Sequence, residues 1–577
     1  MVENFQDNAN FIWQVADDIL RGAFKQHEYG EVILPFVVLR RLDCVLEDCK
    51  DAVIDTHKKF KEKKLPDMTG ILLKATKTKD NPDGLNFFNT SFYDLRRLAQ
   101  DAQNVEINFW DYIKGYSNNV REIIDNFRLE RVIEKLGKND YVFQLIDKFT
   151  EVDLHPNKVS NHQMGYIFEE LLRRFSEMSN ETAGEHYTPR EVIRVMVNVL
   201  FAEHSDDLKG KGIIRSVYDP ACGTGGMLTI AKEHLQEHIN SKVEVVMHGQ
   251  ELNEQTYAIA KSDVLIMGAD ADNIKLGSSF SEDQYQGRKF DYMLSNPPFG
   301  VSWKKEQHFI ENEANNPLGR FSAGLPRISD GALLFLLHMI SKMEQKGSRI
   351  AIIHNGSPLF SGDAGSGESD IRKWIIENDW LEAIIALPTE LFYNTGIATY
   401  IWIVSNKKPQ KRKGKIQLVN AVDFNKKMRK SLGSKRNYIT DEQIQQITDI
   451  YTSFEDGEYC KVFDNADFGY TKITVERPEM KKGKVVKDKQ GNPKSDTSLR
   501  DYEKIPLKQD IDEYFAKEVL PHVPDAWMDR SKDKIGYEIN FTKYFYTYKP
   551  LRPLAEIKAD ILTLEEETEG LLKEILD

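Results

Sequence analysis

SVYDPACGTGGM, at residues 216–227, is the most informative segment of the sequence for the fold. It leaves a strand, turns through a cluster of glycines and enters a helix that we expect to begin near Leu228. Glycines let the backbone approach a ligand closely, and the N-terminus of the following helix offers N–H groups to an anionic group. The dinucleotide fingerprint G-x-G-x-x-G is not met, because Thr224 and Gly226 fall in the wrong frame. The turn therefore indicates a ligand-binding loop and leaves the ligand open.

Short β-branched runs alternate with helical patterns around this stretch. The runs are Ile213–Tyr218, Val243–Met247, Tyr292–Ser295, Ile350–His354, Ala383–Leu387 and Tyr400–Val404. Such alternation is typical of a mostly parallel sheet with helices on both of its faces. The sequence therefore predicts an α/β fold with a doubly wound, Rossmann-like sheet.

A helical region precedes this sheet and a basic, loop-rich region follows it. Apolar residues recur at helical spacing from Asn8 to Cys49, and we expect a lysine-rich loop from Lys58 to Asp83 before helical patterns resume. At 577 residues the chain is too long for one hydrophobic core. We expect a helical N-terminal domain over 1–155, a catalytic domain over 160–480, and a lysine-rich loop with a helical tail over 481–577.

Two features mark the last of these parts. The segment Lys481–Lys494, KKGKVVKDKQGNPK, holds six lysines and has a composition that favours disorder. After it, apolar residues follow alternating spacings of three and four, which is typical of a coiled-coil seam broken only by Thr568. The seam residues are Leu554, Ile557, Ile561, Leu564, Leu571 and Ile575. We expect this helix to dock on a helical partner; packing on the chain's own N-terminal helices is the alternative.

Composition limits the classes of function. The chain is 40% hydrophobic and 29% charged, as in soluble globular proteins, and no apolar run is long enough to cross a bilayer. The acidic, polar N-terminus differs from a secretory signal, so we expect a cytoplasmic protein. The four cysteines are too few and too irregularly spaced for a disulfide framework or a zinc knuckle.

The net charge of −13 has the wrong sign for a protein that holds duplex DNA by itself. Any role in nucleic-acid binding therefore needs a local basic patch or a basic partner. The best candidate patch is Lys407–Arg436, which has twelve lysines or arginines and a single acid, Asp423. An ordinary solvated loop is the alternative, because runs of charge usually do no more than solvate a surface.

An acidic residue, Glu251, closes the strand that follows the glycine turn, in HGQELN. Its carboxylate is placed to accept both hydroxyls of a ribose held over that turn, as in doubly wound nucleoside sites. Taken alone, Glu251 is equally well explained as an exposed residue at the end of a strand. Together with the turn it indicates a nucleoside site.

The strongest chemical signal is Ser295-Asn296-Pro297-Pro298-Phe299, directly after the apolar strand FDYML. Two prolines end the strand and stiffen the backbone, so the Asn296 side chain and the Pro297 carbonyl are held at the sheet's carboxyl edge. Both groups accept hydrogen bonds. An exocyclic amine flipped out of a duplex offers two N–H donors, and Phe299 offers a flat face on which the base can stack. The alternative is a turn followed by a core phenylalanine.

These motifs resemble those of the N6-adenine DNA methyltransferases: DPACGTGGM resembles their cofactor loop and NPPF their catalytic motif. Over nearly the whole chain, the blocks FIWQVADDILRG, SDGALLFLLHMI and LFYNTGIATYIWIV resemble the modification subunits of type I restriction-modification systems. The resemblance implies a methyltransferase sheet that uses S-adenosylmethionine and methylates adenine N6. The catalytic residues that it implies are Asn296, Pro297, Pro298 and Phe299.

The resemblance also implies the cofactor contacts. The stretch GEHYTPR precedes a helix for which we expect Thr188 as N-cap and Pro189 as the first residue, and in the family it packs over the methionine part of the cofactor. One position departs from the pattern, since Ser278 stands where many adenine methyltransferases place an acid facing the cofactor's adenine. The implied cofactor-binding residues are Glu185, His186, Tyr187, Thr188, Pro189, Arg190, Asp219, Gly223, Thr224, Gly225, Gly226 and Glu251.

The partners that the resemblance implies are double-stranded DNA, a DNA specificity subunit that holds two copies of this chain, and a restriction or translocase subunit. Modification by such a complex protects host DNA from cleavage. Transfer from a sulfonium is an in-line displacement that needs positioning and no metal. The pattern His234–His238, H-x-x-E-H, lies on the helix expected after the glycine loop, where a solvated outer face is usual, and so short a pattern often occurs by chance; it is interpreted as a helix face and not as a zinc site.

Two other functions fit the same catalytic core. Protein glutamine methyltransferases usually carry Asn-Pro-Pro-Tyr and are shorter chains, so Phe299 and the helical N-terminus favour DNA. A non-catalytic scaffold on a methyltransferase fold would have lost the motif residues, and here they are intact.

Overall fold

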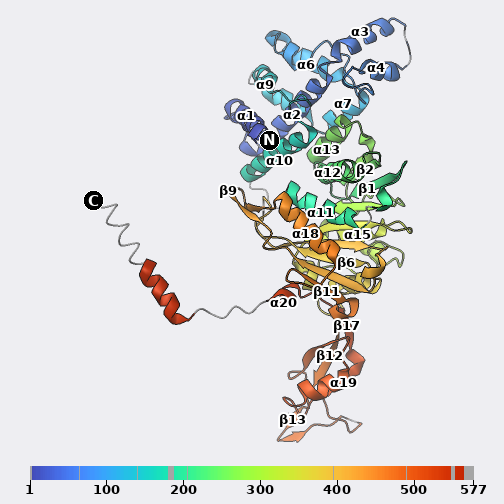
Figure 1. Cartoon of the computed structure of the whole chain (residues 1–577), viewed down its shortest axis with the longest axis vertical. Coiled ribbons are helices and arrows are strands. Elements are labelled where there is room, and N and C mark those ends of the chain that lie inside the picture. Colours follow the sequence, from blue (N-terminus) through green and yellow to red (C-terminus); the bar gives the residue numbers. More distant parts are fainter. Residues whose placement is uncertain are drawn as a thin grey trace. The chain divides into compact units, whose positions relative to one another are not determined.

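The N-terminal part of the chain is helical in the computed structural model (Figure 1). Residues 3–63, 65, 67–138, 141–179, 188–203, 206–393, 395–488, 490–546 and 553–564 are described. Helix α2 lies at the centre of this part and is buried along nearly its whole length, because most of its residues are apolar and its buried Arg40 and Arg41 donate to backbone carbonyls. The helices α1 to α10 are Glu3–Leu20, Tyr29–Leu46, Lys50–Lys61, Thr69–Ala75, Leu95–Leu98, Val105–Lys114, Asn118–Asp125, Leu129–Gly137, Tyr141–Thr150 and Asn161–Ser179.

The prediction of a loop from Lys58 to Asp83 is wrong over part of this range, because the end of α3 and the whole of α4 lie within it. Leu72 of α4 packs with Val53 of α3 and with Phe88 in a small separate core. Within this range Lys58, Lys59, Lys61 and Lys74 of these helices are exposed, and so the sequence there looks polar although one face is buried.

A nine-stranded sheet forms the centre of the molecule, with the order β11-β8-β6-β7-β5-β4-β1-β2-β3. Most neighbours are parallel, but β7 is antiparallel to β5 and β6, and β11 is antiparallel to β8. Every predicted strand is present within two residues of its expected start. The strands β1 to β8 and β11 are Ile214–Asp219, Glu244–Glu251, Ile274–Leu276, Tyr292–Ser295, Arg349–Asn355, Leu381–Ala386, Thr399–Ser405, Lys415–Asn420 and Cys460–Asp464.

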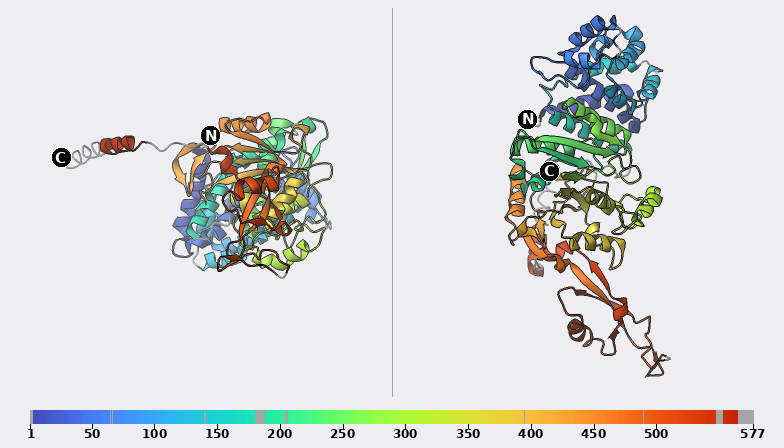
Figure 2. Two further views of the ribbon diagram at one scale, coloured as in Figure 1. Left: turned by 90° about the horizontal axis from the view of Figure 1, so that it is seen from below. Right: turned by 90° about the vertical axis from the view of Figure 1, so that its right-hand side faces the viewer.

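Helices cover both faces of this sheet, as the doubly wound prediction requires (Figure 1 and Figure 2). Successive strand residues point to opposite faces, so Val217 and Leu294 share a core with helices on one side, whereas Tyr218 faces the other. There the Tyr218 hydroxyl and His338 Nε2 are hydrogen-bonded at 3.0 Å. The helices that flank the sheet include α11 (Arg190–Ala202), α12 (Gly226–His234), α13 (Glu254–Ile266), α15 (Ala332–Ser341) and α18 (Asp441–Ser453).

The region after residue 405 is more regular than the loop-rich region expected from its sequence. Strands β8 and β11 extend the main sheet, and a separate antiparallel sheet is built by β12 (Gly469–Glu476), β15 (Asp501–Pro506), β16 (Trp527–Met528) and β17 (Lys534–Tyr537). Its core contains Ile473 and Ile505. The expectation of disorder over Lys481–Lys494 is also corrected, since the short strands β13 (Met480–Lys481) and β14 (Lys484–Val485) pair there.

Residues Asn540–Asp577 form a second compact unit. It contains α20 (Phe541–Phe545) and a helical segment over 554–564 in which every residue is exposed. The seam residues Leu554, Ile557, Ile561 and Leu564 lie in this segment, and Leu571 and Ile575 lie outside the described residues. Among the described helices, none combines the length and the apolar character that crossing a membrane requires.

Candidate active site

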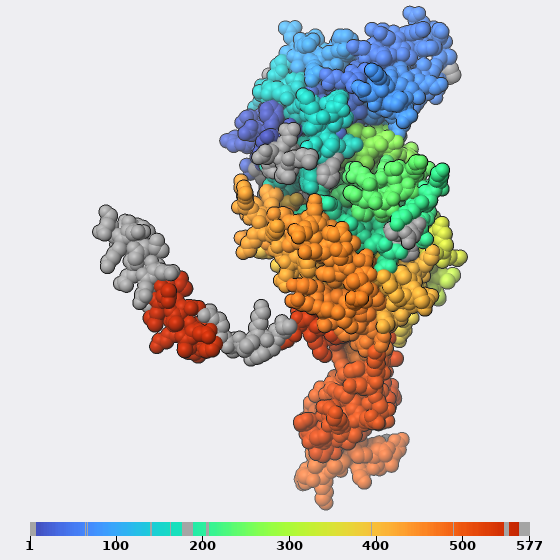
Figure 3. Space-filling model, in the orientation of Figure 1, coloured from blue at the N-terminus to red at the C-terminus, as the bar shows by residue number. Residues whose placement is uncertain are grey.

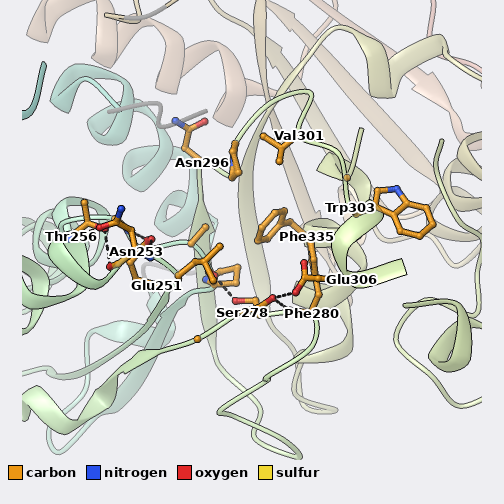
Figure 4. Close-up of a pocket in the computed structure, with 18 of the residues that line it drawn as sticks. Glu251, Asn253, Thr256, Ser278, Phe280, Asn296, Val301, Trp303, Glu306 and Phe335 are labelled. Carbon is orange, nitrogen blue, oxygen red and sulfur yellow. Dashed lines mark hydrogen bonds between the residues drawn. The ribbon is translucent and has the colours of Figure 1, made fainter. Parts of the chain in front are cut away.

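Parallel strands end at the same edge of a sheet, and at this edge the loops after β1, β2, β3 and β4 line one cavity of about 540 Å³. Figure 4 shows Glu251, Asn253 and Thr256 on one side of the cavity and Phe280 and Glu306 on another, with Asn296 on a third. The cavity wall therefore combines residues of the glycine loop, the acidic strand end and the Asn-Pro-Pro motif. The sequence predicted these three groups separately, and the fold brings them together.

The glycine loop turns sharply between β1 and α12. Gly223 and Gly225 have φ of +54° and +82°. This left-handed conformation is sterically strained for residues with a side chain, whereas glycine adopts it freely. Gly225 is the N-cap of α12, which begins at Gly226, two residues before the expected start. Thr224 and Gly226 line a second, smaller cavity of about 60 Å³ beside the loop. The backbone amides of this turn thus border both cavities.

Asp219, the last residue of β1, ties the glycine loop to the catalytic strand. Its Oδ1 accepts hydrogen bonds from the Ala221 backbone N–H at 2.9 Å and from Ser295 Oγ at 2.8 Å. The side chain is buried, and burial raises its pKa to about 7, against the two hydrogen bonds that lower it. Asp219 therefore fixes the distance between the two motifs.

Glu251 ends β2, as the sequence predicted, and its carboxylate faces the loop. Its Oε2 accepts from the Gly223 backbone N–H at 2.8 Å, and its Oε1 accepts from the Asn253 backbone N–H at 2.8 Å. Burial raises the pKa of this carboxyl, while the backbone N–H groups lower it. An acceptor held in this way at the cavity wall suits the hydroxyl groups of a ribose.

The Asn-Pro-Pro-Phe motif follows β4 directly. Asn296 is buried and lines the main cavity, and its Nδ2 donates to Thr188 Oγ1 at 2.8 Å. Phe299 is also buried and meets Phe392 edge to face, with ring centroids 6.3 Å apart. Thr188, just before α11, therefore fixes the Asn296 amide. Phe392, in the loop 387–393, packs against the Phe299 ring.

Helix α11 begins one residue later than expected. Pro189 is its N-cap and Arg190 its first residue, so the prediction of Thr188 as N-cap is wrong. The Thr188 hydroxyl accepts from Asn296 instead, a long-range partner that local capping rules do not consider. Thr188 and Asp219 line the smaller cavity.

Arg190 is buried, with its Nε 3.3 Å from Glu169 Oε1 and its guanidinium over the ring of Tyr166. The predicted residues Glu185, His186 and Tyr187 lie outside the described residues. Of the remaining predicted residues, Pro189, Arg190, Gly225, Pro297 and Phe299 line neither of the two cavities.

Sequence reasoning missed an acidic residue in the cavity. Ser278, the position that departs from the family pattern, donates its hydroxyl to Glu306 Oε1, and Ser281 Oγ donates to the same oxygen at 2.8 Å. Glu306 ends the short 3₁₀ helix η6 (Lys304–Glu306) and lines the cavity beside Phe280. The fold thus places a carboxylate next to Ser278, from a point 28 residues further along the chain.

Two family sequence models match this chain. That of the N-6 DNA methylase family covers residues 159–480, and that of the HsdM N-terminal domain covers residues 8–149. Within the described residues, three or more histidine, cysteine, aspartate or glutamate side chains are nowhere grouped so that they could hold a metal ion.

Characterised proteins and solved structures agree with these matches. The chain is 28% identical over 509 residues to the methylase subunit of the type I restriction enzyme MjaIX from Methanocaldococcus jannaschii, covering 83% of this chain and 82% of that protein. It is 30% identical over 259 residues to the HindI methylase subunit from Haemophilus influenzae, covering 45% and 54% of the two chains. A type I methyltransferase subunit from Streptococcus thermophilus shares the fold, with a TM-score of 0.59 at 22% identity, over 81% of this chain and 97% of that one. The chain therefore belongs to the N-6 DNA methylase family, among the methylase subunits of type I restriction enzymes.

Proposed function

We propose that this chain methylates N6 of adenine in DNA with S-adenosylmethionine, as the modification subunit of a type I restriction-modification complex that protects host DNA from cleavage. One observation carries the proposal: Asn296 lines the same cavity as Gly223 and Glu251. The group suited to bind a target amine and the groups suited to bind a nucleoside cofactor thus share one space.

S-adenosylmethionine would supply a methyl group on a positively charged sulfur, ready for in-line displacement. The residues of the cavity fit its parts. Glu251 offers carboxylate oxygens to the ribose hydroxyls, and the glycine loop allows close approach of the backbone. The smaller cavity beside Thr188 and Asp219 suits the methionine part. For Glu185 to Tyr187, and for Pro189 and Arg190, the proposal rests on the family resemblance.

The position of Glu306 supports a contact with the cofactor's adenine. The adenine amine donates hydrogen bonds, and a carboxylate is its strongest protein acceptor. Ser278 cannot supply that charge, but its hydroxyl and that of Ser281 both donate to Glu306 and hold it at the wall, near the apolar rings of Phe280 and Phe335 (Figure 4). We assign to Glu306 the role that an acid at position 278 plays in many relatives.

The target adenine would be bound by the Asn-Pro-Pro-Phe motif. The lone pair of its amine is delocalised into the ring, and acceptance of its two hydrogens by Asn296 and the Pro297 carbonyl favours an sp³-like nitrogen. The same acceptors stabilise the positive charge that develops on that nitrogen. The hydrogen bond from Asn296 Nδ2 to Thr188 supports this role, because it fixes the plane of the amide. Phe299 is buried against Phe392 and lines neither cavity, so its proposed stacking on the flipped base rests on the family resemblance.

The partners belong to the same proposal. We assign sequence readout to a DNA specificity subunit that holds two copies of this chain, together with a restriction or translocase subunit. The net charge of −13 supports this division, because the chain alone has the wrong overall sign for tight DNA binding. We also propose that 1–155 and 160–480 act as the helical and catalytic domains, close to the two matched ranges. The isolated chain should then bind cofactor with little preference for any DNA sequence.

One experiment separates the proposal from its rivals. The chain is co-purified with candidate specificity subunits and incubated with methyl-labelled cofactor, DNA and protein together. The proposal expects label in N6-methyladenine after nucleoside digestion, measured by mass spectrometry. Label in protein glutamine would support the glutamine methyltransferase, and absence of transfer from a complex that binds cofactor would support the scaffold.

A further inference from the structure

The basic segment 407–436 divides into two halves that the structure uses differently. In the first half, basic side chains are engaged by acids of the main body: Lys408 Nζ lies 2.6 Å from Asp379 Oδ1, and the Arg412 guanidinium 2.8 Å from Glu203 Oε1. Both of these side chains are buried. They anchor the loop that leads into β8, and they present no charge to a partner.

The second half is a hairpin of its own. Strands β9 (Lys426–Leu432) and β10 (Lys435–Tyr438) pair with each other and with neither neighbouring sheet. Figure 1 labels β9 on the left of the orange strands beside α18, and the orange segment in Figure 3 stands out from the surface there. From residue 424 to residue 440 the chain has six lysines or arginines and no acid. This β9–β10 hairpin is therefore strongly positive within a chain of negative net charge.

Two of the six charges hold the hairpin in place. Lys435 is buried and pairs with Glu191 of α11, and Arg436 Nε lies 3.5 Å from Glu390 Oε1. The other four, on β9, are exposed, and the described residues form no ion pair with them. They are Lys426, Lys427, Arg429 and Lys430.

The hairpin is anchored to the loop that supports the catalytic motif. The Ser434 backbone N–H donates to the Tyr393 carbonyl at 2.7 Å, and the Arg436 backbone N–H donates to the Glu390 carbonyl at 2.9 Å. Between these two acceptors lies Phe392, whose ring meets that of Phe299. The hairpin is therefore separated from Phe299 of the catalytic motif by a single loop.

We propose that the β9–β10 hairpin binds the phosphate backbone of duplex DNA beside the flipped adenine. This inference rests on the proposed function and names the part of the chain that meets the DNA. Lysine and arginine side chains neutralise phosphates and release counterions, and a contact next to a flipped nucleotide fixes the duplex against the cavity. Four unengaged cations on one strand, anchored to the loop behind Phe299, suit that task.

The test uses the full chain assembled with its specificity subunit and a fluorescent duplex, with anisotropy measured between 50 and 200 mM salt. One variant replaces the four free cations: Lys426→Gln, Lys427→Gln, Arg429→Gln and Lys430→Gln. A matched control makes the same change of charge on the β13–β14 hairpin: Lys481→Gln, Lys482→Gln, Lys484→Gln and Lys487→Gln. Because each phosphate contact contributes about 0.9 to the magnitude of the slope of log K against log salt, loss of four contacts should make the slope of the β9 variant shallower by about 3.6 and weaken its binding at least tenfold at low salt. The β13–β14 control should keep most of the wild-type salt slope and most of the wild-type affinity for DNA.

Cofactor affinity, measured by calorimetry, should be unchanged in both variants, and replacing the three lysines of β9 by arginine should keep wild-type DNA binding. Wild-type DNA binding and salt slope in the β9 glutamine variant would overturn the hairpin proposal while the methylation proposal stands. Loss of subunit assembly with unchanged DNA binding would overturn it as well, in favour of a protein partner. If the wild-type chain, alone and in its complex, neither binds nor methylates DNA, both the hairpin proposal and the proposed function are wrong.

Discussion

Thr188 Oγ1 accepts a hydrogen bond of 2.8 Å from Asn296 Nδ2, which joins the segment before α11 to the catalytic motif after β4. The two residues are 108 positions apart. Because the amide nitrogen is committed to Thr188, the amide oxygen is the atom of Asn296 suited to accept from a target amine. Thr188 is accordingly a positioning residue in the proposed mechanism.

Replacing Thr188 by valine keeps the shape of the side chain and removes its acceptor. A hydrogen bond of this kind contributes about 1 kcal/mol, so single-turnover methyl transfer by Thr188→Val in the assembled complex should slow by roughly five- to tenfold. Thr188→Ser should stay near the wild-type rate, because the hydroxyl is retained. Equal rates for the valine variant and the wild type would show that the hydrogen bond does not position Asn296.

The role of Glu306 is tested by cofactor affinity. Glu306→Gln removes the carboxylate and keeps the size of the side chain, so calorimetry should show S-adenosylmethionine binding that is weaker by roughly ten- to a hundredfold. Discrimination against an analogue whose adenine 6-amino group is replaced by oxygen should shrink at the same time. The control is Glu311→Gln, five residues further along the chain in α14 (Gln307–Ala314) and outside the residues that line the cavity. Wild-type affinity and discrimination in the Glu306 variant would refute the assignment.

Asp219 makes stability depend on pH. Its folded pKa is raised from 3.8 to about 7, so the folded state holds its proton more tightly than the unfolded state does. Its contribution to stability is therefore complete below pH 4 and is lost as the pH rises towards 7. Asp219→Asn is neutral at every pH and keeps an acceptor for Ser295 and Ala221. The Tm of the variant minus the Tm of the wild type should thus increase from pH 5 to pH 8. A difference that is constant over that range would contradict the assignment.

Much of the fold could be predicted because its strands are apolar and β-branched on both faces, as buried strands must be. Strand β8 was missed since its buried run IQLV is flanked by Lys411, Lys413 and Lys415, and the charges concealed it. In the same way, lysines on the outer faces of α3 and α4 gave a helical region the composition of a loop.

The candidate site could be predicted where one short motif carries the chemistry, as at Gly223, Glu251 and Asn296. It could not be predicted where the fold joins distant segments. Glu306 sits in the charged run KKEQHF and has no local signal of a role in binding; only the tertiary structure places it against Ser278. Thr188 looked like an N-cap because capping rules are local, whereas its observed hydrogen bond is long-range.

The C-terminal helix is expected to serve assembly. Every residue of 554–564 is exposed, and the apolar seam residues Leu554, Ile557, Ile561 and Leu564 lie on this helix, so a partner is expected to cover them. Truncation after Arg552 should leave cofactor affinity and Tm near their wild-type values and should abolish co-purification with the specificity subunit, and with it DNA methylation. A truncated chain that still assembles and methylates DNA, or one that unfolds, would show that the seam has another role.

The most direct test of the central claim is the yield of N6-methyladenine from Asn296→Ala, compared with its cofactor affinity in the same complex. The variant is expected to bind S-adenosylmethionine within a few-fold of wild type, while its rate of methyl transfer falls by at least about a hundredfold, because the lost acceptor would contact the target amine. Phe299→Ala should show a smaller loss. A wild-type rate of N6-methyladenine formation in the Asn296 variant would contradict the account.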